Sequence, residues 1–288
     1  MERCGLILEG GGTRGIYTAG VLDAFLEYDI EIPYIIGVSM GAYNGAAYIS
    51  KQKQRNYKVY REYVNDSRFI NFKRIIQGRS VMDSKFVFEH ANRGKYPFNY
   101  KGFFKSNKVF VSVSTDCSTG EAVYFEKDKY SLEEVDNVIR SSCSLPFVTE
   151  IVEHNNRKFL DGGIADSIPI RRAISDGNQK LIAILTHPKG FEEKQGWYSK
   201  VSSVWYKGYP KLTEALKNRY LCYNESIQIL ELLEMVGKAY IIRPKDAGIS
   251  IVEQDVEKLD EYYRMGWKQG VEEVERIKEF LQDITLSN

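Results

Sequence analysis

The amino-acid sequence predicts an α/β sandwich with a mostly parallel central sheet. Near the N-terminus, an apolar strand, a glycine-rich turn and a helix follow one another twice. Further along, short apolar strands continue to alternate with helical segments, an order typical of a sheet covered by helices. Residues 181–185 are apolar throughout, as strands buried on both faces of a parallel sheet are.

The first two strand–helix pairs are the clearest elements. A strand from Gly5 to Leu8 leads into a glycine-rich turn, and residues 17–26 carry apolar side chains at helical spacing. A second strand, Ile35 to Val38, ends at Ser39. Residues 42–50 then resume as a helix rich in small side chains, which let it lie close to the strands.

The remaining elements complete the sheet and end in an extension. The pattern predicts further strands at residues 109–114, 121–126, 158–160, 181–185 and 239–244, and a helix at 131–142. Residues 253–283 are continuously helical in pattern and strongly charged, so we interpret them as a C-terminal helical extension. The expected division is an enzyme domain of residues 1–245 and an extension of residues 246–288 packed on it.

Composition excludes several classes of protein. Lys and Arg number 40 against 39 Asp and Glu in 288 residues, so no overall charge draws the protein to nucleic acid. The four cysteines are scattered without a C-x-x-C pair, which predicts neither disulfides nor zinc, and three histidines argue against a metal site. No apolar run approaches the length of a membrane span, and the glycine motif begins too early for a signal peptide. We therefore expect a cytoplasmic protein without a metal.

Residues Gly37-Val38-Ser39-Met40-Gly41 match the pattern G-x-S-x-G. Between a strand and a helix, this pattern forms a sharp turn that exposes the serine, and Gly37 and Gly41 are small because neighbouring backbone comes close. The helix dipole then favours a developing alkoxide at Ser39. The alternative is an accidental match of small residues at a strand end.

Residues Gly10 to Gly15 form a second glycine motif, Gly-Gly-Gly-Thr-Arg-Gly. Such a loop presents backbone N–H groups to the oxyanion formed in acyl transfer. It also satisfies the G-x-G-x-x-G pattern of dinucleotide-binding proteins, which place an acidic residue at the end of the second strand. That strand ends at Ser39 instead, and Asp29 and Glu31 precede it. The sequence therefore favours an oxyanion loop, with an NAD(P)-binding protein as the alternative.

A catalytic serine needs a base, and the sequence offers two candidates. Asp161 ends a short strand and precedes Gly162 and Gly163, a turn that allows close approach. A carboxylate shielded from water serves as a general base when its pKa is raised. His187 follows the strand at residues 181–185, and the order Ser39, Asp161, His187 is that of an α/β-hydrolase triad. The other histidines are expected to be structural: His90 in a helix and His154 in a polar turn.

Together, these motifs resemble those of the bacterial patatin-like phospholipases. The family pattern is G-G-G-x-R-G, then G-x-S-x-G, then D-G-G or D-G-A. The chain carries these motifs at Gly10–Gly15, Gly37–Gly41 and Asp161–Gly163, in that order. Residues 144–147 and 166–169 also resemble segments that flank the family aspartate, and the resemblance extends over residues 5–245.

The resemblance implies a three-layer α/β/α sandwich and a serine acyl hydrolase that cleaves carboxylic esters of lipids without a cofactor. It implies a Ser39–Asp161 dyad, which leaves His187 a structural residue. It also implies an oxyanion site made by Gly10, Gly11, Gly12 and Arg14. Met40 stands where a small residue is more usual in the family, and we expect it to narrow the acyl pocket. A catalytically silent lipid-binding protein of the same fold is the further alternative.

Two segments rich in aromatic and basic residues bear on the partners of the protein. Residues 93–108 hold five basic and five aromatic side chains and no acidic one, a composition suited to an anionic lipid surface. The sequence favours the alternative, a partly packed surface loop. Residues 197–211 are similar in kind, and either segment is also suited to lining or covering an acyl groove. We expect a lipid or acyl-ester substrate, peripheral membrane contact as an option, and no nucleic-acid partner.

Overall fold

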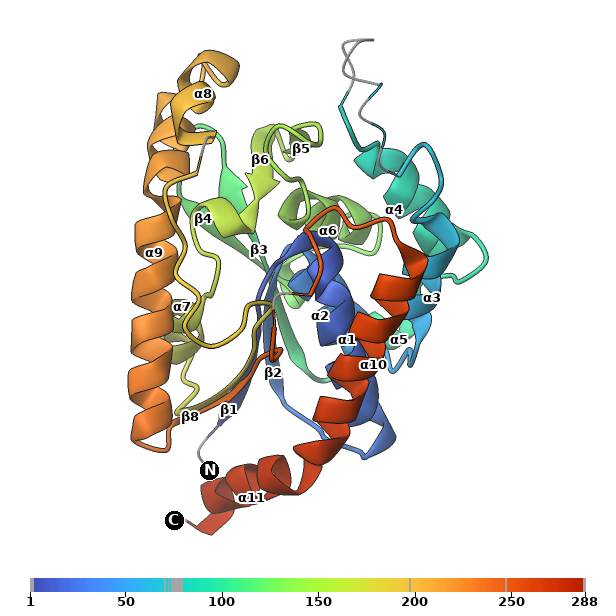
Figure 1. Ribbon diagram of the computed structural model, residues 1–288, viewed down its shortest axis with the longest axis vertical. Helices are drawn as coiled ribbons and strands as arrows, with labels where there is room; N and C mark the ends of the chain where they lie inside the picture. The colour runs from blue at the N-terminus through green and yellow to red at the C-terminus, as the bar shows by residue number, and fades with distance from the viewer. Residues whose placement is uncertain are drawn as a thin grey trace.

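A mixed β-sheet runs through the computed structural model, which describes residues 3–69, 71, 73, 80–196, 198–246 and 248–286 (Figure 1). The strands are β1 (Cys4–Leu8), β2 (Tyr34–Val38), β3 (Val109–Asp116), β4 (Ala122–Glu126), β5 (Val152–His154), β6 (Arg157–Asp161), β7 (Lys180–Ile184) and β8 (Ala239–Ile242). The α-helices are α1 (Gly15–Glu27), α2 (Met40–Ile49), α3 (Arg55–Tyr63), α4 (Ser84–Arg93), α5 (Tyr100–Lys105), α6 (Val135–Ser142), α7 (Ile170–Ser175), α8 (Tyr198–Trp205), α9 (Pro210–Met235), α10 (Val256–Glu272) and α11 (Val274–Leu286). Short 3₁₀ segments are η1 (Gly12–Arg14), η3 (Lys127–Lys129) and η4 (Gly162–Ile164).

The sheet order brings the sequence motifs to one edge. The strands follow the order β5-β6-β3-β2-β1-β7-β8, and β4 pairs with β3 off this path. From β3 to β8 along this path the neighbours are parallel, whereas β4, β5 and β6 pair antiparallel. The carboxyl ends of parallel strands lie at the same edge, so the segments that follow β1, β2 and β7 meet there.

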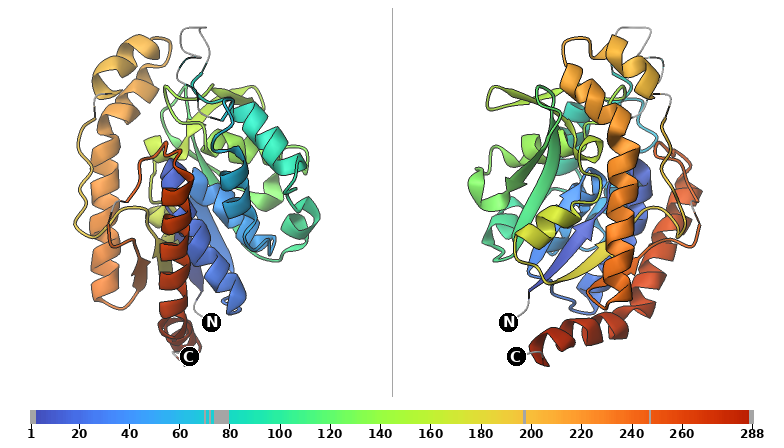
Figure 2. Two further views of the ribbon diagram at one scale, coloured as in Figure 1. Left: turned by 45° about the vertical axis from the view of Figure 1, so that its right-hand side comes forward. Right: turned by 90° about the vertical axis from the view of Figure 1, so that its left-hand side faces the viewer.

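Helices cover both faces of the sheet, which confirms the predicted α/β sandwich. Successive residues of a strand point to opposite faces. In β1, Leu6 and Leu8 pack into a core shared with α1, α2 and α10, whereas Ile7 packs into a second core with α7 and α9. Figure 2 shows α9 crossing one face and the α1 and α10 pair lying on the other. This burial of both faces explains why the central strands are almost entirely apolar.

The C-terminal segment is helical as predicted, but it is not one continuous helix. α10 ends at Glu272 and α11 starts at Val274, and the chain turns between them (Figure 1). α10 lies directly against α1, because Gly20 and Gly266 let the two backbones approach: a Cβ on Gly266 would overlap the carbonyl oxygen of Tyr17. A bulkier residue at either glycine would separate the helices.

Two other differences have local causes. The helix predicted at residues 131–142 begins at Val135, since residues 132–134 form a turn in which Glu134 accepts a hydrogen bond from the backbone N–H of Ser131. The sequence does not predict the 26-residue helix α9. Its apolar residues are not confined to one face, since Leu221, Leu232 and Met235 are exposed. Trp197 lies outside the described residues. Within those residues, no helix has the length and apolar character needed to cross a membrane.

Candidate active site

Ser39 occupies a strained turn between β2 and α2. Its backbone has φ 54° and ψ −128°, a conformation that residues other than glycine rarely adopt. The flanking glycines are required sterically: a Cβ on Gly37 would lie 2.6 Å from the Ala42 nitrogen, and one on Gly41 would overlap the Leu8 carbonyl oxygen. The Ser39 backbone N–H donates to Ser142 Oγ at 2.9 Å. The serine is therefore held at a fixed position, and it is buried.

Sheet register brings Asp161 beside Ser39. Val38 of β2 pairs with Val113 of β3, so the next residues along the two strands are Ser39 and Ser114. Ser114 in turn pairs with Asp161, the last residue of β6. Since β4 occupies the opposite side of β3, β2 and β6 lie on the same side of it, and the end of β2 at Ser39 meets the end of β6 at Asp161.

Asp161 presents one free oxygen within the site. Its Oδ1 accepts the backbone N–H of Gly163 at 2.8 Å. Its Oδ2 is buried and has no hydrogen-bond partner among the described residues. The Ser39 side chain is near enough to lower the pKa of this carboxyl, although its contact falls short of hydrogen-bond geometry. Catalytic hydrogen bonds are often long before substrate binds.

The protonation of Asp161 is set mainly by its burial. Burial raises the pKa of the carboxyl from its ordinary value of 3.8 to about 6, because the charged form loses its hydration. The Ser39 hydroxyl, the Gly163 N–H and the Arg219 charge oppose this rise. At neutral pH the group is therefore ionised and is a stronger base than an ordinary aspartate.

The glycine loop lies against both Ser39 and the C-terminal segment. A Cβ on Gly10 would come within 2.9 Å of the Ser39 Cβ, and one on Gly11 within 2.7 Å of Thr186 Oγ1. Gly12 has φ 56°, and a Cβ there would overlap the Ile251 carbonyl oxygen. None of the hydrogen bonds described for this part of the chain uses the N–H groups of Gly11, Gly12 or Met40. These donors are available to an anion beside Ser39.

Residues 250 and 251 of the C-terminal segment accept hydrogen bonds from Thr13 of this loop. The Thr13 backbone N–H donates to the Ile251 carbonyl at 3.1 Å, and its hydroxyl donates to the Ser250 carbonyl at 2.8 Å. On the other side of the loop, the Tyr60 hydroxyl of α3 donates to the Gly12 carbonyl at 3.2 Å. The loop is therefore positioned by residues far from it in the sequence.

His187 pairs with Arg14 and not with the serine. Its Nδ1 lies 3.1 Å from Arg14 Nη1, which donates to it, and its ring stacks on Phe191 with centroids 3.5 Å apart. Burial, with help from the charges of Arg14 and Arg219, lowers the pKa of His187 to about 3, so the ring is neutral. No described hydrogen bond joins it to Ser39 or Asp161.

The other two histidines lie elsewhere. His90 belongs to α4, as predicted, whereas His154 ends β5 just before the turn at residues 155 and 156. Neither lines a cavity that contains Ser39.

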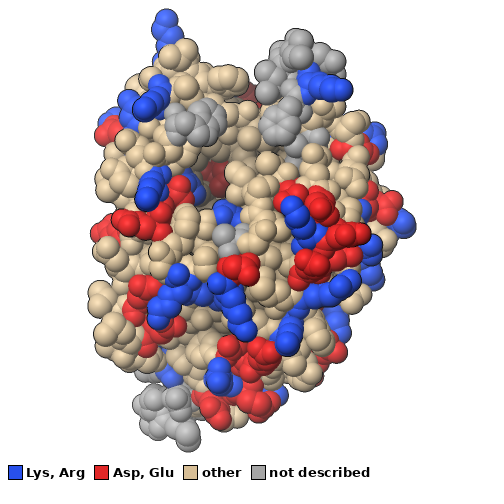
Figure 3. All heavy atoms as spheres, in the orientation of Figure 1, with Lys and Arg blue, Asp and Glu red and all other residues tan. Residues whose placement is uncertain are grey.

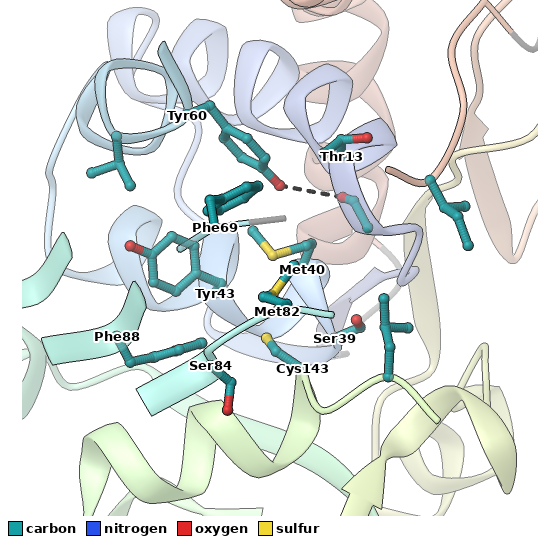
Figure 4. A pocket seen from close by; sticks show the side chains of 14 residues that line it. Thr13, Ser39, Met40, Tyr43, Tyr60, Phe69, Met82, Ser84, Phe88 and Cys143 are labelled. Atoms are coloured by element: carbon teal, nitrogen blue, oxygen red, sulfur yellow. Dashed lines mark hydrogen bonds between the residues drawn. The ribbon is translucent and has the colours of Figure 1, made fainter. Parts of the chain in front are cut away.

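Two cavities meet at Ser39. The smaller, of about 60 Å³, is apolar, and Figure 4 shows Met40 and Met82 at its centre, with Ser39 at one side and the rings of Tyr43 and Phe69 at the other. The larger, of about 410 Å³, contains Asp161, the glycine loop and two arginines, Arg14 and Arg219. Ile251 and Leu145 line both.

Arg219 is one of the site residues that the sequence did not identify. It comes from α9, and its Nε donates to the Gly163 carbonyl at 2.8 Å, while its Nη1 pairs with Glu193 at 3.0 Å. It thereby supports the turn that follows Asp161. Since 56 residues separate Arg219 from Gly163 and no motif surrounds it, the sequence contains no signal that identifies it.

Comparison with known proteins gives two family matches. The family model "Patatin-like phospholipase" matches residues 6–174, which contain the glycine loop, Ser39 and Asp161. A second model, of a domain of unknown function (DUF6363), matches residues 209–282, which contain α9 and α10. The predicted division of the chain at residue 245 stays a prediction.

Curated relatives are bacterial and fungal. The uncharacterized protein YjjU of Escherichia coli K12 is 31% identical over 204 residues, which are 69% of this chain and 56% of that protein. Lysophospholipase NTE1 of Coccidioides immitis is 27% identical over 95% of this chain and 18% of its own length. The chain thus matches about half of the bacterial relative and under a fifth of the fungal one.

A solved structure supports the fold. Human GIVD cytosolic phospholipase A2, in complex with methyl gamma-linolenyl fluorophosphonate, aligns with a TM-score of 0.51 and 9% identity, over 98% of this chain and 59% of that one. At this identity the likeness concerns the fold alone.

Proposed function

Because the chain belongs to the patatin-like phospholipase family, we propose that it hydrolyses lipid esters with Ser39 as nucleophile and Asp161 as general base. Family membership confirms the resemblance seen in the sequence, and it supports the expectation of an enzyme of this class. The dyad, the oxyanion site and the substrate are our proposal for this chain.

The observation that carries the proposal is the free oxygen of Asp161. A buried carboxylate oxygen without a hydrogen-bond partner lowers the stability of the fold, and such a group is typical of a functional site. It lies beside a serine in a strained turn, and its pKa of about 6 suits a base that works near neutral pH. His187, neutral and bonded to Arg14, is not needed as a base.

The proposed reaction has two halves. Asp161 takes the proton of the Ser39 hydroxyl as Oγ attacks the ester carbonyl, and the N–H groups of Gly11, Gly12 and Met40 hold the oxyanion. The tetrahedral intermediate collapses, the ester C–O bond breaks, and Asp161 returns the proton to the leaving alcohol. Water, deprotonated by Asp161, then attacks the acyl-serine, and the released Ser39 oxygen recovers a proton. Loss of one oxyanion donor in such sites costs roughly 3–4 kcal/mol of barrier.

The two cavities suggest how a lipid ester lies in the site. The apolar chamber beside Met40 suits the acyl chain, and its small volume of about 60 Å³ supports the expectation that Met40 narrows it. The larger cavity, with its arginines and carboxylates, suits the polar alcohol portion. Relatives named lysophospholipases are consistent with a single-chain lipid ester as the substrate class.

The remaining expectations belong to the same proposal. All four cysteines are free thiols, three of them buried, as a reducing cytoplasm allows. The enzyme domain would comprise residues 1–245, with α10 and α11 in an extension packed on α1. Contact with a membrane surface is also part of the proposal, because the proposed substrate is a lipid.

Hydrolysis of p-nitrophenyl esters of increasing chain length tests the proposal. We expect turnover by the wild-type protein, none by Ser39→Ala, a loss of at least about 10²-fold in Asp161→Asn, and most of the activity in His187→Ala. Loss in His187→Ala with activity kept in Asp161→Asn would replace the dyad by a triad. No turnover at any length, together with retained binding of a fatty acid, would favour the catalytically silent lipid-binding protein. A melting temperature raised by NAD(P) would favour the dinucleotide-binding alternative.

A further inference from the structure

Helix α8 presents an apolar outer face to solvent at one end of the molecule. Its inner residues Ser199 and Ser202 are buried, whereas Val201, Val204 and Trp205 are 37%, 81% and 62% exposed. In Figure 1 the helix stands at the tip of α9, at the end opposite α11 and the two termini. We call Lys200, Val201, Val204, Trp205 and Lys207 the outer face of α8.

The outer face is anchored to the wall of the larger cavity. Tyr206, which follows α8, is buried, and its hydroxyl accepts the backbone N–H of Phe147 at 2.9 Å. The Trp205 ring meets the Phe147 ring edge-on, with centroids 5.7 Å apart. Phe147 lines the cavity that contains Ser39 and Asp161. Figure 3 shows the surface hollowed beside this end of the molecule.

The charge around the outer face points to an anionic partner. Residues 195–213 contain no Asp or Glu. Lys200 and Lys207 are exposed, and no ion pair is formed by either within the described part of the chain. Exposed apolar side chains flanked by free cations are the features that bind the surface of an anionic bilayer.

The first aromatic and basic segment, residues 93–108, differs. Its rings are largely packed, with Phe98 and Phe103 buried in the core. Several of its cations are paired: Lys95 with Glu62, Lys108 with Glu31 and Arg93 with Asp136. The structure thus favours the second segment over the first as a surface for lipid.

We propose that the outer face of α8 docks on a lipid bilayer that carries anionic headgroups. Val204 and Trp205 enter the interfacial layer, and Lys200 and Lys207 face the phosphates. Docking sets the cavity wall at Phe147 against the membrane, so a lipid ester reaches Ser39 without crossing bulk water. This delivery route rests on the proposed function, whereas the docking itself does not.

Vesicle co-sedimentation tests the docking separately from catalysis. It uses the Ser39→Ala protein, which leaves the lipid intact, and vesicles of phosphatidylcholine with and without phosphatidylglycerol. We expect binding that requires phosphatidylglycerol and weakens with salt. Val204→Glu should reduce the partition coefficient by about tenfold, since an apolar side chain that enters the bilayer is replaced by a charge that the anionic surface repels. Lys200→Glu with Lys207→Glu should reduce it by at least about tenfold.

Matched controls lie at the far end of α9 and in the first aromatic and basic segment. Met235 is 82% exposed at the opposite end of α9, and Lys101 and Lys105 are exposed on α5. Met235→Glu, and Lys101→Glu with Lys105→Glu, should leave vesicle binding within about twofold of the parent. Equal losses in the controls, or undiminished binding by Val204→Glu, would overturn the proposal.

Two further readouts separate the alternatives. A dimer in solution that Val204→Glu dissociates would assign the outer face to a second copy of the chain and overturn the proposal. In the Ser39-containing protein, Val204→Glu should keep its turnover of a soluble short-chain ester and lose turnover of vesicle lipid. Absence of turnover in every assay, with vesicle binding intact, would refute the proposed function and leave the docking supported.

Discussion

Ser39 and Asp161 act on the same proton, but the chain holds them in different ways. The turn at Ser39 is made by its immediate neighbours: Gly37 and Gly41 permit the close backbone contacts, and α2 begins at the next residue. Asp161 also has a local turn, through Gly163, but that turn is supported from α9 by Arg219. The nucleophile is thus positioned by local backbone geometry, and the base is in part positioned and tuned by a remote charge.

This difference predicts how substitutions near each of the two residues should change the activity and its pH dependence. On the nucleophile side, a change of one backbone contact displaces the serine or the oxyanion loop, and activity falls at every pH. On the aspartate side, a change of a remote charge shifts the pKa of the base, and the effect depends on pH.

The largest effect is expected from Asp161→Asn. Removal of a general base lowers turnover by roughly 10²–10⁴-fold. The same variant should be more stable than the wild type at pH 7. Because the folded pKa of about 6 exceeds the ordinary 3.8, the unfolded chain loses its proton first, and ionised Asp161 costs up to about 3 kcal/mol above pH 6.

Below about pH 3 both states of the wild type are protonated, so the stability gain of Asp161→Asn should vanish there. Denaturant unfolding of both proteins at about pH 3 and pH 7.5 checks this. A variant that is less stable than the wild type at pH 7.5 would mean that Asp161 stabilises the fold.

The next effect is expected from Gly12→Ala. Its Cβ would overlap the Ile251 carbonyl oxygen, and its φ of 56° is unfavourable for alanine, so the oxyanion loop shifts. We expect kcat to fall by roughly 10²–10³-fold, as when one oxyanion donor is lost. Gly177→Ala is the control, because Gly177 has φ 89° but no neighbour within 4 Å. If the two variants kept equal activity, the loop would not hold the oxyanion.

A smaller, pH-dependent effect is expected from Arg219→Met. The Arg219 charge lowers the pKa of Asp161, so its removal should move the acid limb of kcat/KM, near pH 6 in the wild type, to higher pH. Activity should fall by up to about tenfold below pH 6 and by no more than about twofold at pH 7. Arg219→Lys keeps the charge and should keep the limb closer to its original position. Equal pH profiles for all three proteins would exclude this role for Arg219.

The smallest effect is expected from Tyr60→Phe. The variant loses one hydrogen bond, to the Gly12 carbonyl, and a neutral hydrogen bond of this kind contributes about 1 kcal/mol. We expect kcat to fall by about fivefold with KM unchanged. Tyr63→Phe, on the same helix, removes a hydrogen bond to the His90 carbonyl away from the site and should have no effect on kcat. A lower kcat in both variants would point to damage to α3 and not to the loop.

The sequence was sufficient for the parts of the fold and site that depend on local pattern. The strands that carry the motifs could be predicted because burial on both faces makes them apolar, and the turns because glycines mark close backbone approach. Arg219, Tyr60 and Ile251 could not be predicted. Each is separated by 48 or more residues in the sequence from the loop or turn that it contacts, and no motif in its own segment marks it.

The pairing of His187 shows the same limit. The order Ser39, Asp161, His187 fits a triad in one dimension, and only the three-dimensional arrangement shows that the ring pairs with Arg14. Likewise, the two aromatic and basic segments look alike in composition, and burial separates them.

Covalent labelling with an alkyl fluorophosphonate tests the central claim most directly, because this reagent phosphonylates an activated serine with loss of fluoride. We predict one adduct per chain, located on Ser39 by peptide mass spectrometry, absent in Ser39→Ala and formed far more slowly in Asp161→Asn. Labelling of the wild type should weaken below pH 6, as Asp161 becomes protonated. An adduct on another residue, or equally fast labelling of Asp161→Asn and wild type, would contradict the Ser39–Asp161 dyad.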